Sequence, residues 1–262
     1  MPKLIDSFLY FNEEHLILPR FQYLWDIIDH FVVVECNLTH AGLPKPMYFK
    51  ENEHKFSKYM SKIIYAPFYV DEYKGSWDLE NAQRNHIASA LTRFDNRDYV
   101  IISDADEIPS KGILPNLMHF LQNKNGYAIT LVQLLFYYDF HYAGQEGWTG
   151  SVLTHVETAL QQTPQFLRED NWFERPWKNY HHLSVRAAGW HLSYWNTPEM
   201  IQHKIKNFAH QEFNKDEFTD IDYIKNQIKE GKDIFNRNNV SFLPYPEHLI
   251  PEDILKLFEK SY

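Results

Sequence analysis

Short apolar runs alternate with segments of helical spacing through the first half of the chain. The runs at 4–11, 31–36 and 99–103 consist largely of aliphatic and aromatic residues, which is typical of buried strands. Apolar residues at helical spacing in about 12–28 and 77–93 predict helices between these strands. Strands that alternate with helices favour an α/β fold, with a mostly parallel central sheet flanked by helices.

The second half is patterned less regularly but predicts several more elements. We expect helices at 113–122, 198–208, 220–230 and 251–260, and strands within 127–140 and 183–194. Thr197-Pro198-Glu199 is a typical helix start, with a capping hydroxyl followed by a proline and an acid. The stretch 140–180 has no clear period, so it is either a loop region that covers a substrate or a poorly patterned part of the core. No repeat or linker interrupts the chain, which favours a single domain over 1–262.

Composition and charge narrow the classes of function. A net charge of −9 argues against a nucleic-acid partner, which would require a basic surface. Aromatic residues make up 16% of the chain and indicate either a core rich in large rings or a cleft with stacking platforms. Cys36 is the only cysteine, and no segment approaches the roughly 18 apolar residues of a transmembrane helix. We expect a cytoplasmic protein without a transmembrane segment that could associate peripherally with a membrane.

An acidic cluster, Asp104-Ala105-Asp106-Glu107, directly follows the strand predicted at 99–103. If the strand geometry continues, Asp104 and Asp106 point the same way and repel one another unless a cation offsets the repulsion. Mg²⁺ or Mn²⁺ bridging to ligand phosphates would do so. A solvated acidic turn is the simpler alternative. Phosphatases of the haloacid dehalogenase type also carry Asp-X-Asp after an apolar strand, but there the motif opens the fold and continues with glycine, whereas here Glu107-Ile108 follow.

Taken together, these motifs and several others resemble glycosyltransferase family 17. The matching stretches run in order from about residue 9 to about residue 251: Phe11-Asn12-Glu13 with Arg20 and Leu24, residues 31–39 and 42–46, Arg84, residues 101–109, residues 188–193, and Thr197-Pro198-Glu199. The resemblance implies a GT-A-type fold, Mn²⁺ or Mg²⁺ as cofactor, inversion at the anomeric carbon, and a UDP-sugar donor, by default UDP-N-acetylglucosamine. Residues 1–110 would form the nucleotide-binding half, and residues 111–262 the acceptor half with the C-terminal helices.

The animal members of the family carry a membrane anchor and a longer luminal chain, which this sequence does not contain. We therefore expect the acceptor to be a glycan or glycolipid other than an N-glycan, such as a lipid-linked intermediate.

By this resemblance, residues from both halves of the chain hold the metal and the sugar donor. Asp106 is the expected first metal ligand, Asp104 lies by the metal or the donor ribose, and Glu107 supports them or contacts the donor sugar. His191 is the candidate metal ligand from the second half, with Trp190 beside it at the donor.

Three further residues are candidates for the nucleotide. Arg84 offers a fork for phosphate, with a surface arginine as the alternative. Glu35 and Asn37, at the end of a buried strand, are candidates for uracil or ribose, with a helix-facing polar cap as the alternative.

Inversion requires a base that takes the proton of the acceptor hydroxyl. Glu212 is the first candidate and Glu146 the second, and for each the alternative is an ordinary surface acid. Trp148, Trp172 and Trp177 are candidates for stacking on acceptor sugars, with core packing as the alternative.

The predicted function is transfer of a sugar, most simply N-acetylglucosamine, from UDP to a glycan acceptor by a metal-dependent inverting enzyme. A catalytically inactive carbohydrate-binding protein and the phosphatase described above are the alternatives.

Overall fold

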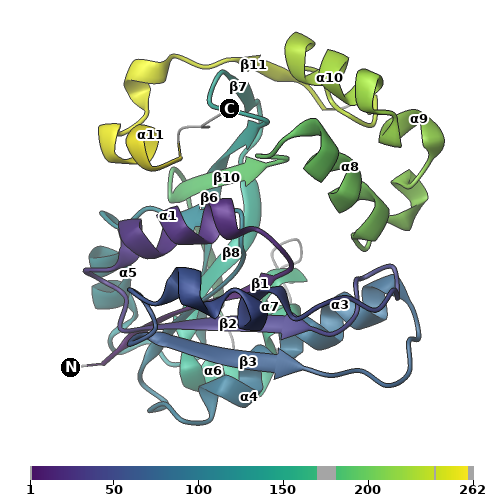
Figure 1. The fold of residues 1–262 in the computed structure, drawn as a ribbon. Helices are drawn as coiled ribbons and strands as arrows, with labels where there is room; N and C mark the ends of the chain where they lie inside the picture. Colours follow the sequence, from purple (N-terminus) through teal and green to yellow (C-terminus); the bar gives the residue numbers. More distant parts are fainter. Residues whose placement is uncertain (1, 170–180, 239, 259–262) are drawn as a thin grey trace.

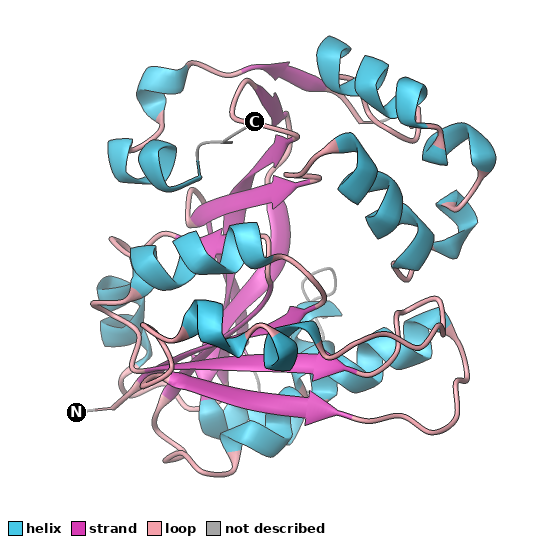
Figure 2. Cartoon of the chain, viewed as in Figure 1, coloured by secondary structure: helices cyan, strands magenta, loops and turns pink. Residues whose placement is uncertain are grey.

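A mixed β-sheet runs through the molecule and carries helices on both faces (Figures 1 and 2). The computed structural model describes residues 2–169, 181–238 and 240–258. Within these residues the sheet has eleven strands, with the main order β11-β7-β6-β8-β4-β1-β2-β3. The strands are β1 Leu4–Tyr10, β2 His30–Cys36, β3 Ile63–Phe68, β4 Tyr99–Asp104, β5 Glu107–Pro109, β6 Tyr127–Tyr137, β7 Tyr142–Gly144, β8 Trp148–His155, β9 His181–Val185, β10 Gly189–Ser193 and β11 Phe242–Pro244.

Helices connect the strands and close the C-terminal part. They are α1 Glu14–Leu24, α2 Tyr48–Glu51, α3 Ser76–Asn85, α4 Ile87–Leu91, α5 Leu114–Leu121, α6 Val156–Gln162, α7 Pro164–Glu169, α8 Pro198–Asn207, α9 Asp216–Thr219, α10 Ile221–Glu230 and α11 Glu252–Phe258. The predicted helix start is confirmed, because Thr197 Oγ1 accepts a hydrogen bond from the backbone N–H of Met200 at 3.3 Å. In the described ranges, no helix is long and apolar enough to cross a membrane.

The parallel part of the sheet lies where the sequence predicts it. β1 pairs in parallel with β2 and β4, and β2 pairs in parallel with β3. α1 connects β1 to β2, and α3 and α4 connect β3 to β4. The single helix predicted at 77–93 is two helices, which meet at His86. The α/β class is thus confirmed, and the ends of β1, β2 and β4 share one edge.

The other part of the sheet contains both parallel and antiparallel pairs, and β6 pairs in parallel with β9 and β10. β8 pairs antiparallel with both β4 and β6, so the sheet as a whole is mixed. Parallel neighbours need a crossover of a dozen or more residues, and the short connections from β6 through β7 to β8 force reversal instead. β8 lies in the stretch 140–180, where Gly147 and Gly150 obscure its period.

The two faces of the sheet bury separate clusters, because side chains alternate along each strand. Phe31 and Val33 of β2 pack with α1 on one face. Val100 and Ile102 of β4 pack with α4 and α6 on the other. A third cluster joins Tyr137 to the helices α8, α9 and α10. Continued alternation puts Glu35 on the α1 face and Asp104 on the α4 face, which decides what each can contact.

Candidate active site

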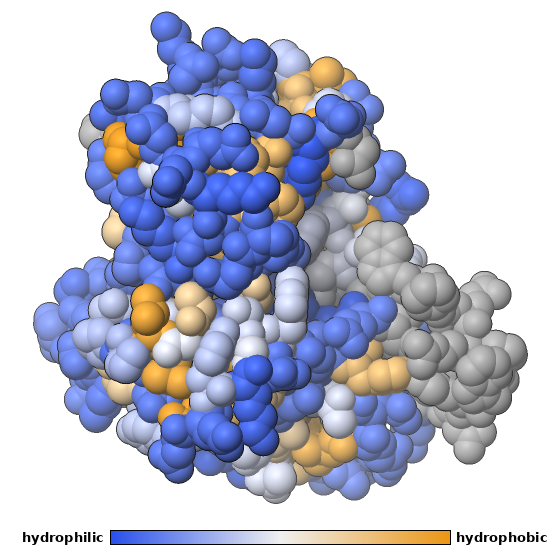
Figure 3. All heavy atoms as spheres, turned by 90° about the vertical axis from the view of Figure 1, so that its right-hand side faces the viewer, coloured by the Kyte–Doolittle hydropathy of each residue, from blue (hydrophilic) through white to orange (hydrophobic). Residues whose placement is uncertain are grey.

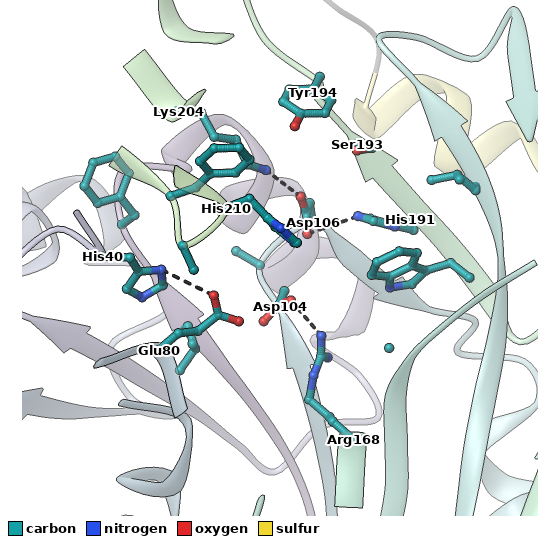
Figure 4. A pocket seen from close by; sticks show the side chains of 18 of the residues that line it. His40, Glu80, Asp104, Asp106, Arg168, His191, Ser193, Tyr194, Lys204 and His210 are labelled. Atoms are coloured by element: carbon teal, nitrogen blue, oxygen red, sulfur yellow. Dashed lines mark hydrogen bonds and ion pairs between the residues drawn. The ribbon is translucent and has the colours of Figure 1, made fainter. Parts of the chain in front are cut away.

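A cavity of about 850 Å³ opens at the end of β4 (Figure 4). Side chains from both halves of the chain line it, including His40, Trp77 and Arg84 from the first half and Arg168, His191 and Lys204 from the second. Its volume falls in the range of natural ligand sites, roughly 300–1,000 Å³. The acidic cluster lies at its wall, where Asp104, Ala105 and Asp106 form part of the lining.

The acidic cluster forms a turn, and the buried Arg20 holds that turn from below. β4 ends at Asp104 and β5 begins at Glu107, so the strand geometry assumed for the cluster does not continue. Arg20 Nη1 donates to the carbonyl oxygens of Asp104 at 2.8 Å and Glu107 at 2.9 Å. Its Nε and Nη2 donate to the two oxygens of Asp6 at 2.8 and 2.6 Å. The guanidinium therefore fixes the backbone of the cluster without reaching the cavity itself.

Asp104 is held by two arginines. Its Oδ1 accepts from Arg84 Nη2 at 2.7 Å, and its Oδ2 accepts from Arg168 Nη2 at 2.7 Å. Arg84 also donates to Glu80 on α3 at 3.0 Å. Arg84 thus lies at the cavity as predicted, and Arg168 on α7 joins it there. Two guanidinium groups beside the cluster suit a bound phosphate.

Glu107 lies behind the cavity wall, so the structure does not support a direct contact with the donor sugar. It is fully buried and accepts hydrogen bonds from Ser151 Oγ at 2.8 Å, Trp148 Nε1 at 2.5 Å and Arg168 Nη1 at 2.6 Å. Burial works against its charge, but Arg168 lowers the pKa of Glu107 to about 2. A Cβ at position 150 would collide with the Glu107 carboxylate, so Gly150 makes room for it. Glu107 therefore positions Arg168 and Trp148.

Asp106 pairs with His191 and Lys204 across the cavity wall (Figure 4). Its Oδ2 lies 2.9 Å from Lys204 Nζ, and its Oδ1 lies 3.5 Å from His191 Nε2. Burial disfavours these charges, but Lys204 and His191 hold the pKa of Asp106 well below its usual value. Likewise, Asp106 raises the pKa of Lys204 above its usual value, despite burial. The predicted meeting of Asp106 and His191 is thus present in the structure.

Gly189 makes this meeting possible. Its φ of +147° is one that other residues rarely adopt, and a Cβ there would collide with the carbonyl oxygen of Ile108. β10 can therefore lie against β5, and in this antiparallel pair of strands the backbone of His191 lies opposite that of Glu107. Trp190 points the other way from His191, since neighbours alternate along a strand, and its ring contacts Tyr23 in the core. Trp190 is consequently a core residue and not the donor contact that we predicted.

The side chains at this wall supply some of the ligands that a divalent cation needs. Asp106 and His191 offer one carboxylate and one imidazole, a ligand set that suits Mn²⁺. Asp104 does not join them as predicted, because both of its oxygens accept from arginines. No group of three or more His, Cys, Asp or Glu in the described part of the chain is placed to hold a metal ion. Asp106 and His191 therefore fit a cation whose other ligands are phosphate oxygens and water.

Glu35 and Asn37 lie away from the cavity, contrary to prediction. Glu35 faces the α1 side of the sheet and accepts from Tyr65 Oη at 2.9 Å and from Lys45 Nζ at 3.1 Å. Asn37 bonds both the N–H and the carbonyl of Val70, at 2.8 and 3.3 Å, and so fastens the end of β2 to the next loop. The alternative interpretation, a helix-facing polar cap, agrees with the position of Glu35 on the α1 side, whereas Asn37 binds the next loop.

The two candidate bases differ in their position relative to the cavity. Glu146 lines the cavity from the loop between β7 and β8. Glu212 does not line it, but its neighbour His210 does, and His210 Nδ1 lies 2.7 Å from Glu212 Oε1. Trp148 lies at the cavity, with its ring centroid 4.4 Å from that of His191. Trp172 and Trp177 lie outside the described residues.

Sequence reasoning missed four residues that shape the site: Arg20, Arg168, Lys204 and His210. Arg20 appeared only as part of a motif, because nothing in sequence shows that it reaches three backbone carbonyls far along the chain. Arg168 falls in the unpatterned stretch 140–180. The helical spacing of α8 was the usable signal for Lys204, since that helix follows the strand that carries His191.

Comparisons with known proteins identify the family of the chain. The family model described as glycosyltransferase family 17 matches residues 1–245. The beta-1,4-mannosyl-glycoprotein 4-beta-N-acetylglucosaminyltransferase of Rattus norvegicus is 26% identical over 266 residues, which cover 88% of this chain and 48% of that protein. The Homo sapiens protein of the same name is also 26% identical, with 88% of this chain and 49% of that protein covered. The chain thus spans about half the length of the curated relatives it matches.

Two solved structures are similar to parts of the chain. The crystal structure of GalNAc-T7 with UDP, GalNAc and Mn²⁺ is 8% identical with a TM-score of 0.47, covering 75% of this chain and 45% of that one. The crystal structure of 4-diphosphocytidyl-2C-methyl-D-erythritol synthase is 10% identical with a TM-score of 0.43, covering 71% of this chain and 89% of that one. At these values neither likeness identifies a ligand for this chain.

Proposed function

The chain belongs to glycosyltransferase family 17, and from this we propose that it transfers a sugar from a UDP donor to a glycan or glycolipid acceptor. The relatives named as N-acetylglucosaminyltransferases make N-acetylglucosamine the first sugar to test. The observation that carries the proposal is the wall at which Asp106 and His191 meet, with Arg84, Arg168 and Lys204 around them.

The cations at this wall are suited to a diphosphate. Arg84 and Arg168 present planar forks beside Asp104, and Lys204 presents an ammonium beside Asp106. The diphosphate gains negative charge as the sugar leaves, and fixed positive groups that stabilise this charge lower the barrier. Because both arginines are held by carboxylates, they are already oriented before a donor binds.

Asp106 and His191 are the residues that would hold Mn²⁺ or Mg²⁺ at the diphosphate. When bound there, the cation would add positive charge that stabilises the leaving group. Lys204 would then be drawn from Asp106 toward the phosphate oxygens, since it is the flexible member of the pair.

The face on which α3 and α8 lie, seen in Figure 3, is mostly hydrophilic, and its apolar residues lie in small separate patches. A surface of this kind suits a polar glycan better than it suits a ligand with an extended apolar surface. Inversion requires that the acceptor hydroxyl attack the anomeric carbon from the side opposite the diphosphate.

A thermal-shift screen of UDP-sugars with Mn²⁺, followed by a transfer assay, tests the proposal. A donor present at about 100 times its Kd stabilises the fold by roughly 2.7 kcal/mol, which raises the melting temperature measurably. We expect UDP-N-acetylglucosamine with Mn²⁺ to stabilise the protein and to be turned over. Sugar binding that ignores UDP and metal would indicate an inactive carbohydrate-binding protein. Release of phosphate from small phosphomonoesters would indicate a phosphatase. Either result contradicts the proposal.

A further inference from the structure

His210 and Glu212 form a hydrogen-bonded pair at the mouth of the cavity. They follow α8 in the chain, and His210 is part of the cavity lining whereas Glu212 lies outside it. His210 Nδ1 is 2.7 Å from Glu212 Oε1, and the two side chains are 47% and 55% exposed. The imidazole therefore has one nitrogen on a carboxylate and its other edge available to the cavity and solvent.

The chemistry of the pair fixes which nitrogen carries the proton. The hydrogen bond from His210 lowers the pKa of Glu212 below its usual value, although slight burial opposes this. An ionised carboxylate can only accept, so the Nδ1 of His210 donates to it. In the neutral ring the free lone pair then lies on Nε2. A histidine oriented in this way by a carboxylate is equipped to accept a proton.

The surroundings of His210 connect it to both the donor wall and an aromatic platform. His210 lines the same cavity as His40, Asp104 and Asp106, all of which are labelled in Figure 4. Burial raises the pKa of Glu80, but the larger combined effect of Arg84, its hydrogen-bond partner, and of His40, Arg168 and, least, His210 lowers it. The carboxylates that interact with His210 include Glu212 on its own segment and Glu80 on α3.

Trp77 supplies the platform. It lines the cavity, is 45% exposed, and meets the His210 ring edge-on with 4.5 Å between centroids. An exposed indole beside a cavity offers a flat apolar face to the C–H face of a sugar ring. A sugar stacked on Trp77 would have its hydroxyl groups close to His210.

We propose that His210 is the base of the transfer reaction, positioned by Glu212, and that Trp77 holds the accepting sugar beside it; this rests on the proposed function. The acceptor hydroxyl oxygen forms a bond to the anomeric carbon, and the bond from that carbon to the diphosphate oxygen breaks. The electron pair of the broken bond leaves with the nucleoside diphosphate. The hydroxyl proton passes to Nε2 of His210, and the resulting imidazolium is stabilised by Glu212 until the proton is lost to solvent.

The inference changes the role of Glu212 and removes the need for a carboxylate at the acceptor. Glu212 acts through His210 and does not reach the cavity. Glu146 is the rival base, because it lines the cavity from the opposite loop.

Hydrolysis of UDP-N-acetylglucosamine by water tests the inference without a known acceptor, because water also has to lose a proton. We expect His210→Gln to lower kcat by about 10²–10⁴-fold with little change in the donor KM, and to remove the acid limb of the kcat–pH profile. Glu212→Gln should lower kcat by roughly 10-fold and shift that limb. Trp77→Ala should raise the KM for a sugar acceptor.

The matched control is His141→Gln, because His141 also pairs with a carboxylate, Asp139 at 3.1 Å, and is not part of the cavity lining. It should leave kcat and the pH profile unchanged. If His210→Gln retains wild-type kcat while Glu146→Gln loses it, the inference is overturned in favour of Glu146, and the proposed function stands. If the wild type neither binds nor hydrolyses UDP-sugars, the proposed function itself fails.

Discussion

Each carboxylate of the acidic cluster has a different task. Asp104 holds Arg84 and Arg168, and Asp106 meets His191 and Lys204. Glu107 is buried beneath them and anchors Arg168. The pattern of three acids indicated a charged centre, but the division among them follows from the turn, which points neighbouring side chains toward different elements.

The buried Glu107 should make stability depend on pH. Its folded-state pKa of about 2 lies below the ordinary 4.5, so its contribution is complete above pH 4.5 and is lost as pH falls toward 2. A shift of this size corresponds to about 3 kcal/mol. We expect the free energy of unfolding, measured with urea, to decrease less from pH 6 to pH 3 in Glu107→Gln than in the wild type. Glu217→Gln, at an exposed position, is the control and should lose as much as the wild type.

Prediction of individual residues succeeded for one pair and failed for a residue on the other face of the sheet. Asp106 and His191 were predicted together, and they meet. Glu35 was predicted with them because it ends a neighbouring strand, but it faces the other side of the sheet. Which face a strand end presents depends on register with its neighbours, and a single sequence does not contain that information.

At the scale of elements, the turn between β4 and β5 depends on a helix that is distant in sequence. Arg20 on α1 donates to the carbonyl oxygens of this turn and to Asp6 on β1. The guanidinium and Asp6 are both fully buried, so neither can lose its partner without leaving a buried charge.

Arg20→Met should lower the free energy of unfolding by about 3–5 kcal/mol, because it leaves Asp6 charged and unpaired in the core. Adding Asp6→Leu should restore part of this loss by removing the unpaired charge. Donor binding should stay weak in the double variant, since the turn still lacks its anchor. Chemical denaturation of the single and double variants measures the coupling, and Arg93→Met at an exposed position is the control. Additive losses would show that the pair is not coupled.

The elements that sequence predicted well are those with long, regular apolar patterns. The strands β1, β2 and β4 and the helices α8 and α10 lie within about two residues of their predicted bounds. β8 was missed, although it pairs with both β4 and β6. Glycine is required there by the site, and it interrupts the alternating pattern by which a strand is predicted. Gly150 makes room for Glu107, which is a constraint from tertiary structure.

At the scale of the whole molecule, the site exists only where the two halves of the chain meet. The first half supplies Asp104 from β4 and Arg84 and Trp77 from α3, and the later elements supply His191 and Lys204. The α8–α10 helices pack on Tyr137 as a cluster of their own and carry His210 to the mouth of the cavity. Recognition of the family from ordered motifs predicted this partnership, since those motifs come from both halves.

The most direct test of the account is calorimetric titration of the protein with UDP, with Mn²⁺ and with a chelator. We predict that Mn²⁺ strengthens UDP binding by at least about tenfold, or 1.4 kcal/mol, and that Asp106→Asn abolishes this difference. Asp222→Asn, whose side chain is 94% exposed, should bind like the wild type. Equal UDP affinity with and without the metal, or no UDP binding by the wild type, would contradict the account.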